Sequence, residues 1–178
     1  LYNRGPVADM IEDNGVRVRD LEMTSNTEIA ALHRLYRTIR LGRYDVVHTH
    51  LYRSQVYGHP AARLAATPVV VTTEHSIGET KIERRPMSKP VRALYLGADR
   101  FSQATIAVSD VVRDRLVRWG VSDQKITVIP NAIEFSRIAF DPRGRAWVRA
   151  QLGIAPNARV IGVLGRLDPN KRVDLVIR

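Results

Sequence analysis

The sequence predicts an α/β fold built on a parallel sheet with helices on both faces. Short apolar runs rich in β-branched residues alternate along the chain with longer stretches in which apolar residues recur every three or four positions. Repeated alternation of this kind is typical of strand–helix units. Such units need a doubly wound parallel sheet to bury the apolar faces of both elements.

Six short segments carry the apolar pattern of a strand. They are residues 15–21, 45–50, 68–75, 105–109, 125–129 and 160–164. The third segment is so rich in β-branched residues that we expect it to be buried on both faces of the sheet. Pro130 ends the fifth segment, because proline cannot donate a hydrogen bond to a neighbouring strand.

Six longer segments have the period of a helix. They are residues 7–14, 27–41, 54–66, 87–101, 110–119 and 143–152. Ser25 or Asn26 can cap the second helix, and Gly42 can end it. Gly153 can end the last one in the same way. The segments 76–85 and 131–142 lack periodicity, so we expect a loop and a linker there.

The composition indicates a globular protein that binds anions. The chain has 178 residues, of which 44% are hydrophobic and 26% charged. It has no cysteine, which excludes disulfides and cysteine-ligated zinc. The net charge of +10 favours nucleic acid, an acidic membrane surface or phosphorylated small molecules as partners. An arginine-rich coding bias would give the same charge, so charge alone does not choose among them.

Both ends of the sequence interrupt a pattern. The chain starts at Leu1 rather than at a methionine, and residues 173–178 stop inside a helix-like pattern with no glycine or asparagine to end it. One strand and half a helix cannot bury their own apolar faces. We therefore expect the sequence to be a fragment of a longer chain, truncated at both ends.

The strand, loop and helix pattern at 160–171 is a candidate binding site for an anion. Ligands of open α/β sheets bind beyond the carboxyl ends of the strands, where a helix amino terminus attracts negative charge. Arg166 and Lys171 add two positive charges there, and Gly165 leaves room for a ligand to approach the backbone. The spacing fits a phosphate or diphosphate. Two solvated basic side chains beside a turn would give the same pattern.

Five short motifs follow one another in order along nearly the whole chain. They are residues 45–50, 72–75, 106–109, 129–133 and 165–171. In order and spacing they resemble glycosyltransferase family 4, the retaining nucleotide-sugar transferases built from two Rossmann-like domains in the GT-B fold. The resemblance implies an acceptor-side domain at residues 1–134, without its first strand. It places the linker and the beginning of the donor-binding domain at residues 135–178.

The resemblance also implies which residues bind the donor. Arg166 and Lys171 match the family's basic pair on the donor diphosphate, beside Gly165. Cleavage of the bond between sugar and phosphate puts negative charge on the diphosphate, and two fixed cations stabilise that charge.

Near the reacting carbon, the resemblance points to histidine. His75 matches a family histidine that contacts the donor sugar, and we expect it to be catalytic. Without the resemblance, a structural histidine bonded to backbone would explain this residue. His50, Arg53 and Ser109 are the candidates on the acceptor side.

Two histidines on one strand raise the question of a metal ion. His48 and His50 are two residues apart and therefore share a face of the strand. The resemblance, the absence of cysteine and the absence of an Asp-x-Asp pair all favour a metal-independent enzyme. We expect no metal and no cofactor, with the nucleoside diphosphate sugar acting as a substrate.

The expected helix at 87–101 is basic and amphipathic. Many members of the family act on lipid-linked acceptors at the cytoplasmic face of a membrane, as in the synthesis of cell-envelope glycans. We therefore expect a cytoplasmic protein, with two alternatives for this helix. It adsorbs to anionic lipid, or it packs on the sheet with a solvated face.

The sequence thus predicts a glycosyltransferase that moves a sugar from a nucleoside diphosphate sugar to a glycan, a lipid-linked acceptor or a small molecule, with retention. The fragment itself is expected to be inactive. A nucleotide-sugar epimerase of the same fold is one alternative, and a basic α/β module that binds nucleic acid is another. A low aromatic content of 6% and the lack of a nucleic-acid motif argue against the second alternative, so we expect no nucleic-acid partner.

Overall fold

The structure is a computed structural model that describes residues 5–25, 27–78, 81–82, 85–165 and 173–177. The chain divides into two compact units, Leu1–Ala132 and Ile133–Arg178.

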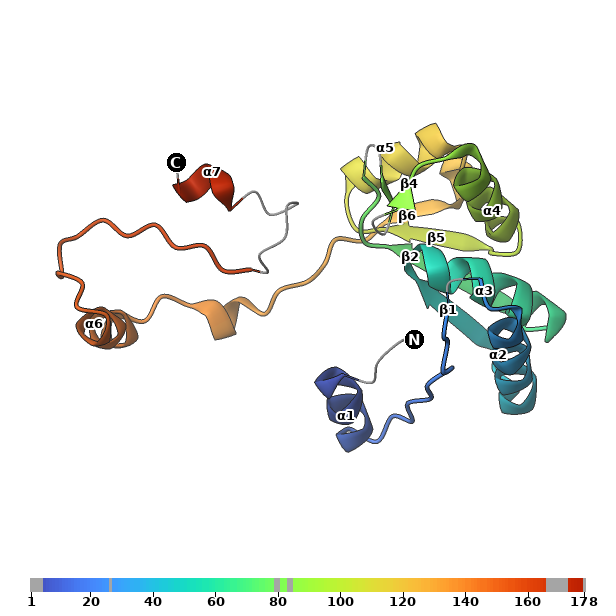
Figure 1. Cartoon of the computed structure of the whole chain (residues 1–178), viewed down its shortest axis with the longest axis horizontal. Helices are drawn as coiled ribbons and strands as arrows, with labels where there is room; N and C mark the ends of the chain where they lie inside the picture. Colours follow the sequence, from blue (N-terminus) through green and yellow to red (C-terminus); the bar gives the residue numbers. More distant parts are fainter. Residues whose placement is uncertain (1–4, 26, 79–80, 83–84, 166–172, 178) are drawn as a thin grey trace. The chain divides into compact units, whose positions relative to one another are not determined.

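Four parallel strands form the main sheet of the first unit, in the order β1–β2–β5–β6 (Figure 1). Their bounds are Val46–His50 (β1), Val69–Glu74 (β2), Ala104–Ala107 (β5) and Ile126–Val128 (β6). Each neighbouring pair is parallel, so the carboxyl ends of the strands lie at one edge of the sheet. This arrangement confirms the predicted α/β class with a parallel sheet.

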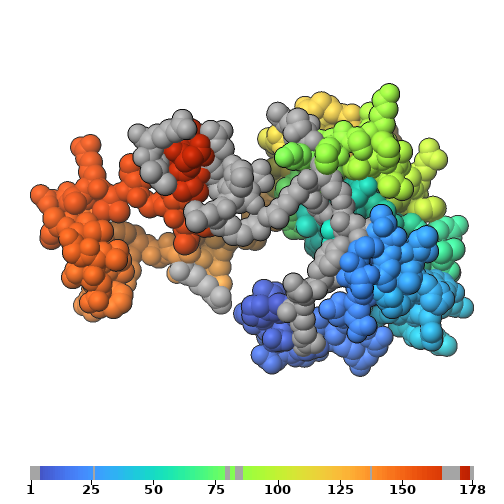
Figure 2. All heavy atoms as spheres, viewed as in Figure 1, coloured from blue at the N-terminus to red at the C-terminus, as the bar shows by residue number. Residues whose placement is uncertain are grey.

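Four helices pack with these strands. Their bounds are Ile29–Gly42 (α2), Leu51–Leu64 (α3), Lys89–Asp99 (α4) and Asp110–Trp119 (α5). Helix α3 contacts both α2 and α4. In the space-filling view the atoms of α2 (blue) and those of α3 and α4 (cyan to green) form one continuous surface (Figure 2). Ser88 and Ser109 cap α4 and α5 with their side chains, and Gly120 ends α5 with a φ of 102°.

Two apolar clusters hold these helices against the sheet. In the larger cluster the ring of Tyr95 lies 6.1 Å from that of Tyr52 and 5.3 Å from that of Trp119, which joins α3, α4 and α5. The smaller cluster lies between α2, α3 and the sheet. Its buried members are Ile39, Ala61, Ala62, Ala65 and Val70. The paired residues Val46 and Val69 point to the other face and stay 53% and 38% exposed. The clusters therefore cover one face of the sheet.

The segment expected to be a loop at 76–85 contains a small ladder. Strand β3 (Lys81–Ile82) pairs with β4 (Arg85–Pro86) in an antiparallel arrangement. Ile77 and Ile82 are each only 1% exposed and belong to the larger cluster. Burial of these two side chains fixes the segment on the helices, although its sequence lacks the alternation of a strand.

The predicted strand at 15–21 was wrong. Residues 16–24, which follow helix α1 (Pro6–Asp13), have no regular structure, and Val16 is 58% exposed. A strand needs a neighbour that takes up its backbone hydrogen bonds, and none of the described strands pairs with this segment.

Helix α2 has the predicted position but different ends. Its N-cap residue is Glu28, whose carboxylate accepts hydrogen bonds from the backbone N–H and the hydroxyl of Thr24 at 2.7 and 2.9 Å. Ser25 is not the cap, and Asn26 lies outside the described residues. Gly42 is still helical, and Arg43 follows it in the left-handed conformation with a φ of 48°.

The described residues of the second unit form three short helices. They are η2 (Phe135–Ile138), α6 (Pro142–Gln151) and α7 (Asp174–Ile177). Another short 3₁₀ helix, η1 (Asp123–Lys125), precedes β6 in the first unit.

The predicted strand at 160–164 was wrong, since Ile161 is 85% exposed and the segment has no regular structure. No described residue of this unit offers it a strand to pair with.

Candidate functional site

Three histidines come together at the carboxyl ends of β1 and β2. His48 and His50 lie on β1, and His75 follows β2 directly. The ring centroids of His48 and His50 are 4.4 Å apart, and those of His50 and His75 are 5.2 Å apart. Both pairs are stacked. These three residues are called the histidine stack below.

Two hydrogen bonds fix the histidine stack. His50 Nδ1 lies 2.9 Å from His75 Nε2, and His48 Nε2 lies 2.8 Å from Thr73 Oγ1. Thr73 is opposite His50 in the strand register and is 6% exposed, so its hydroxyl is held by the sheet. Both bonds connect β1 to β2 or to the residue that follows it, which ties the rings to the rigid part of the fold.

The backbone turns sharply just after His50. Leu51, the first residue of α3, has a φ of 70°, a left-handed conformation that costs a residue other than glycine about 1–2 kcal/mol. Strained residues of this kind cluster at functional sites. Here the turn ends β1 at the residue that contacts His75.

The stack favours the neutral form of its middle ring. Burial lowers the pKa of His50 below its ordinary value, and charge repulsion from the neighbouring rings of His48 and His75 lowers that pKa further. A neutral imidazole has one donor and one acceptor nitrogen. His50 is therefore suited to share a hydrogen bond with another ring at neutral pH.

A buried polar pair lies on the other face of β2, beneath the stack. Glu74 and Tyr95 are both fully buried. Burial raises the pKa of the Tyr95 phenol far above its ordinary value, and the charges of Glu74 and Asp99 raise it further. Tyr95 therefore keeps its proton beside Glu74.

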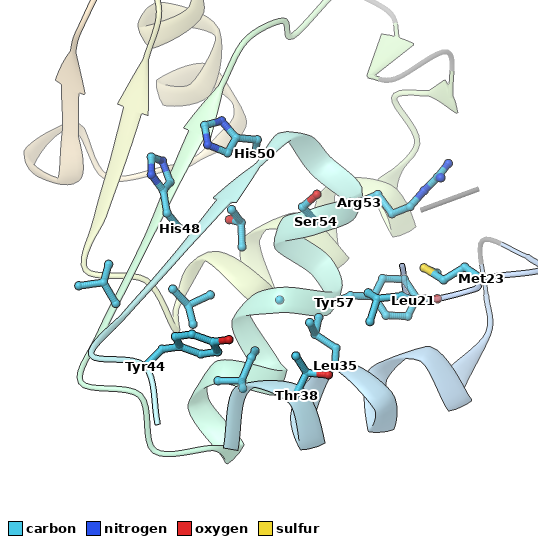
Figure 3. A pocket seen from close by; sticks show the side chains of 15 residues that line it. Leu21, Met23, Leu35, Thr38, Tyr44, His48, His50, Arg53, Ser54 and Tyr57 are labelled. Atoms are coloured by element: carbon cyan, nitrogen blue, oxygen red, sulfur yellow. The ribbon is translucent and has the colours of Figure 1, made fainter. Parts of the chain in front are cut away.

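A cavity of about 470 Å³ runs along β1 (Figure 3). Its apolar part is lined by Leu21, Met23, Leu35, Ile39, Tyr44, Val46 and Val47. His48, His50, Arg53 and Ser54 line its polar part. Figure 3 shows the side chain of Arg53 pointing away from His48 and His50. The cavity thus reaches the histidine stack, but Arg53 does not join it.

The structure brings some of the predicted site residues together and leaves others apart. His50 and His75 are in direct contact. Ser109 follows β5 at the same edge of the sheet, and its hydroxyl accepts a hydrogen bond from the N–H of Val112 at 3.3 Å. Gly165 is exposed in the second unit, where a Cβ would meet nothing within 4 Å. Arg166 and Lys171 lie outside the described residues.

Reasoning from the sequence missed Thr73 and the part that His48 plays. The signal was present, because His-x-His ends one strand and Thr-Thr-Glu-His ends the next. Adjacent parallel strands in register place these two endings side by side. What the pattern does not contain is the pairing of Thr73 with His50, which depends on the register of the sheet.

The basic helix contributes most of its apolar residues to the core. Tyr95 is fully buried in the larger cluster, and Val91, Leu96 and Met87 pack against it. The Nε of Arg92 donates a hydrogen bond to the carbonyl of Trp119 at 2.8 Å. These contacts support the alternative in which this helix packs on the sheet.

Two features are absent from the described residues. Among the described residues, no three side chains of histidine, cysteine, aspartate or glutamate lie together so that they could hold a metal ion. The helices of this part of the chain are all too short or too polar to cross a membrane.

Several known proteins are similar to this chain. One is the UDP-Gal:α-D-GlcNAc-diphosphoundecaprenol α-1,3-galactosyltransferase of Escherichia coli, which is 27% identical over 94% of this chain and 44% of its own length. Another is the D-inositol 3-phosphate glycosyltransferase of Actinosynnema mirum, with 31% identity over 77% of this chain and 34% of its own length. The chain thus spans less than half the length of these relatives.

A solved structure has the same fold. Anabaena HepE in complex with UDP and glucose superposes on 98% of this chain with a TM-score of 0.81 and 21% sequence identity. The match covers 47% of the HepE chain. The sequence profile of Glycosyltransferase Family 4 matches residues 7–137, well over half of the sequence. The chain therefore belongs to glycosyltransferase family 4.

Proposed function

We propose that this chain is the acceptor-side domain and the beginning of the donor-side domain of a retaining glycosyltransferase. Membership of the family supports the reaction class. The observation that carries the site is the contact between His50 and His75 at the carboxyl edge of the sheet. Open α/β sheets bind their ligands at this edge.

The proposed donor is a nucleoside diphosphate sugar, with uridine as the first base to test. HepE has been solved with UDP and with UDP-glucose, and the relative from Escherichia coli is named for UDP-Gal. The proposed acceptor is a hydroxyl of a glycan or of a lipid-linked sugar. The diphosphoundecaprenol in the name of the same relative supports the lipid-linked choice.

In the proposed reaction the acceptor oxygen bonds to the anomeric carbon as the bond from that carbon to the diphosphate oxygen breaks. Attack on the face that the diphosphate leaves retains the configuration, and the acceptor proton passes to the leaving diphosphate. His75 contacts the donor sugar near the reacting carbon. Arg166 and Lys171, assigned from the sequence alone, stabilise the charge on the leaving group, so no metal is needed for that task.

We also propose that the whole protein binds the cytoplasmic face of a membrane peripherally. Leu94 on α4 is 56% exposed and Phe101 just beyond it is 38% exposed. Both line an apolar hollow with Val56, Pro60, Pro90, Ala93, Gly97 and Ala98. Exposed Arg100 and Lys89 lie at the two ends of α4. Exposed apolar side chains flanked by cations suit an anionic lipid surface, where a lipid-linked acceptor would be found.

The test uses the whole protein with a panel of UDP-, GDP- and ADP-sugars and separates the products. Sugar attached to an added acceptor, with its anomeric configuration retained, supports the proposal. A rearranged nucleotide sugar with no transfer would indicate an epimerase. Binding of nucleic acid that falls steeply with salt, with no sugar nucleotide turned over, would indicate a basic binding module instead.

A further inference from the structure

His50 and His75 of the histidine stack share a hydrogen bond between their rings, and family membership does not explain what it does. His75 is the residue proposed to contact the donor sugar. Its Nε2 lies 2.9 Å from Nδ1 of His50, and so that nitrogen faces a protein group. Among the described residues, no hydrogen bond is formed by Nδ1 of His75.

A bond between two imidazoles links the positions of their hydrogens. One nitrogen must donate and the other must accept, and a neutral ring has only one of each. If Nδ1 of His50 carries its hydrogen, His75 accepts at Nε2 and carries its own hydrogen on Nδ1. The state of the His75 nitrogen that faces away from the bond is therefore set by His50.

His50 is itself held in place from two sides. The ring of His48 stacks on it at 4.4 Å, and Nε2 of His48 is bonded to the hydroxyl of the buried Thr73. On the chain side, Leu51 turns the backbone with a φ of 70° immediately after His50. The ring that contacts His75 thus lies against His48 and immediately before this turn.

We propose that His50 is a positioning residue for His75. It holds one tautomer and one orientation of the His75 ring, so that Nδ1 of His75 is presented to the hydroxyl groups of the donor sugar. His48 acts on the same ring through stacking. This inference rests on the proposed function, because it assigns His50 a part in the same site.

Three substitutions separate the hydrogen bond from the ring. His50→Phe keeps an aromatic ring for stacking but has no nitrogen. His50→Asn removes the ring and places an amide nitrogen or oxygen where Nδ1 was. His50→Ala removes both. His33→Asn serves as the control, since His33 is exposed on α2 and, among the described aromatic rings, lies near Tyr36 alone.

The kinetic measurement is made with the whole protein and its donor. His50→Phe and His50→Ala are expected to lower kcat by about 10- to 100-fold with the KM for the donor changed less than about threefold, because a misplaced reacting group acts mainly on the chemical step. His50→Asn is expected to recover kcat to within about fivefold of the unchanged protein. A kcat in His50→Phe equal to that of the unchanged protein would overturn the inference, as would a His50→Asn variant no better than His50→Ala.

The second measurement does not depend on turnover. In protein labelled with ¹⁵N-histidine, NMR shifts of the ring nitrogens show one tautomer for His75 at pH 7.5, and His50→Phe turns this signal into an averaged mixture. An unchanged His75 signal overturns the inference even where transferase activity is present. Loss of the proposed function is recognised separately, since the unchanged protein would then transfer no sugar from any donor.

Discussion

Lys125, just before β6, contacts Asp99 at the end of α4. Its ammonium lies 2.7 Å from the backbone carbonyl of Asp99 and 2.9 Å from the carboxylate of the same residue. Asp99 is 6% exposed, and the hydroxyls of Ser102 and Thr105 lie 3.3 Å from its Oδ1. The contact fixes the end of α4 next to the amino ends of β5 and β6, opposite the sheet edge that carries the histidine stack.

Removal of Lys125 is therefore expected to destabilise the protein. Lys125→Ala leaves a buried carboxylate without its cation, and we expect the free energy of unfolding to fall by about 2–3 kcal/mol. The measurement is urea denaturation followed by the fluorescence of Trp119, in a Trp147→Phe background. Arg113→Ala is the matched control, because Arg113 pairs with Asp123 at the surface. Arg113→Ala should lower the free energy of unfolding by less than about 1 kcal/mol. Equal losses in the two variants would show that the contact of Lys125 with Asp99 is no stronger than a surface ion pair.

His59 makes stability depend on pH. Its Nδ1 lies 3.0 Å from the carbonyl of Ala98, which can only accept, so Nδ1 carries the hydrogen and Nε2 contacts the hydroxyl of Thr49 at 2.9 Å. Burial lowers the pKa of His59 below 6.5. In the unfolded chain this histidine takes up a proton as the pH falls through 6.5, whereas in the folded chain it does so only at a lower pH. Stability is therefore fully present above that pH and decreases below it.

The measurement compares the protein with His59→Gln at pH 7.5 and pH 5.5. Between these values the unchanged protein should lose up to about 1 kcal/mol more than the variant, since one proton per pH unit is worth at most about 1.4 kcal/mol. His50 also has a lowered pKa, but it is present in both proteins and cancels in the difference. If the free energy of unfolding changes equally with pH in the two proteins, the pKa of His59 is not lowered by folding.

The end of α2 offers a stabilising substitution. Arg43 is exposed and follows the helix with a φ of 48°, a conformation that glycine adopts without strain. Arg43→Gly should raise the free energy of unfolding by about 1 kcal/mol, less a few tenths for the lost charge at the helix carboxyl end. Gly120, at the end of α5 with a φ of 102°, is the reverse control. Gly120→Ala should destabilise, and a destabilised Arg43→Gly would contradict the argument.

Membrane binding is tested by co-sedimentation with vesicles. Leu94→Asp places a charge on the exposed side of α4 and leaves the buried Tyr95 untouched. The unchanged protein should sediment with vesicles that contain phosphatidylglycerol at low salt, and the variant several-fold less. Leu41→Asp, an exposed leucine on α2, is the control for added negative charge. Failure of the unchanged protein to bind at low salt would exclude this surface as a lipid contact.

Local patterns were enough to predict most of the first unit. The stripe that contains Leu32, Leu35 and Ile39 predicts α2, and the β-branched run at 68–75 predicts β2. The expected burial of that run on both faces was wrong, since Val69 is 38% exposed. The position of His75 at the end of a strand predicts that it reaches the ligand edge. The contact of His50 with His75 was not predicted, because it depends on the order of the strands in the sheet.

The wrong predictions concern segments whose structure depends on a second segment of the chain. The segments 15–21 and 160–164 have the residues of a strand, but a strand forms only against another strand. The hydrogen bond of His48 to Thr73 depends on register, which no single segment contains. For Gly165, Arg166 and Lys171 the assignment to the donor diphosphate remains a prediction.

Donor cleavage by the whole protein with its preferred nucleotide sugar reports on all three assigned donor-side residues. We expect His75→Ala, Arg166→Ala and Lys171→Ala each to lower the rate of cleavage by about 10²- to 10³-fold, since each removes a group that stabilises the transition state. His33→Ala on the exposed side of α2 should leave the rate unchanged. Cleavage that persists at the full rate in all three variants, or an intact folded protein that cleaves no nucleotide sugar, would contradict the account.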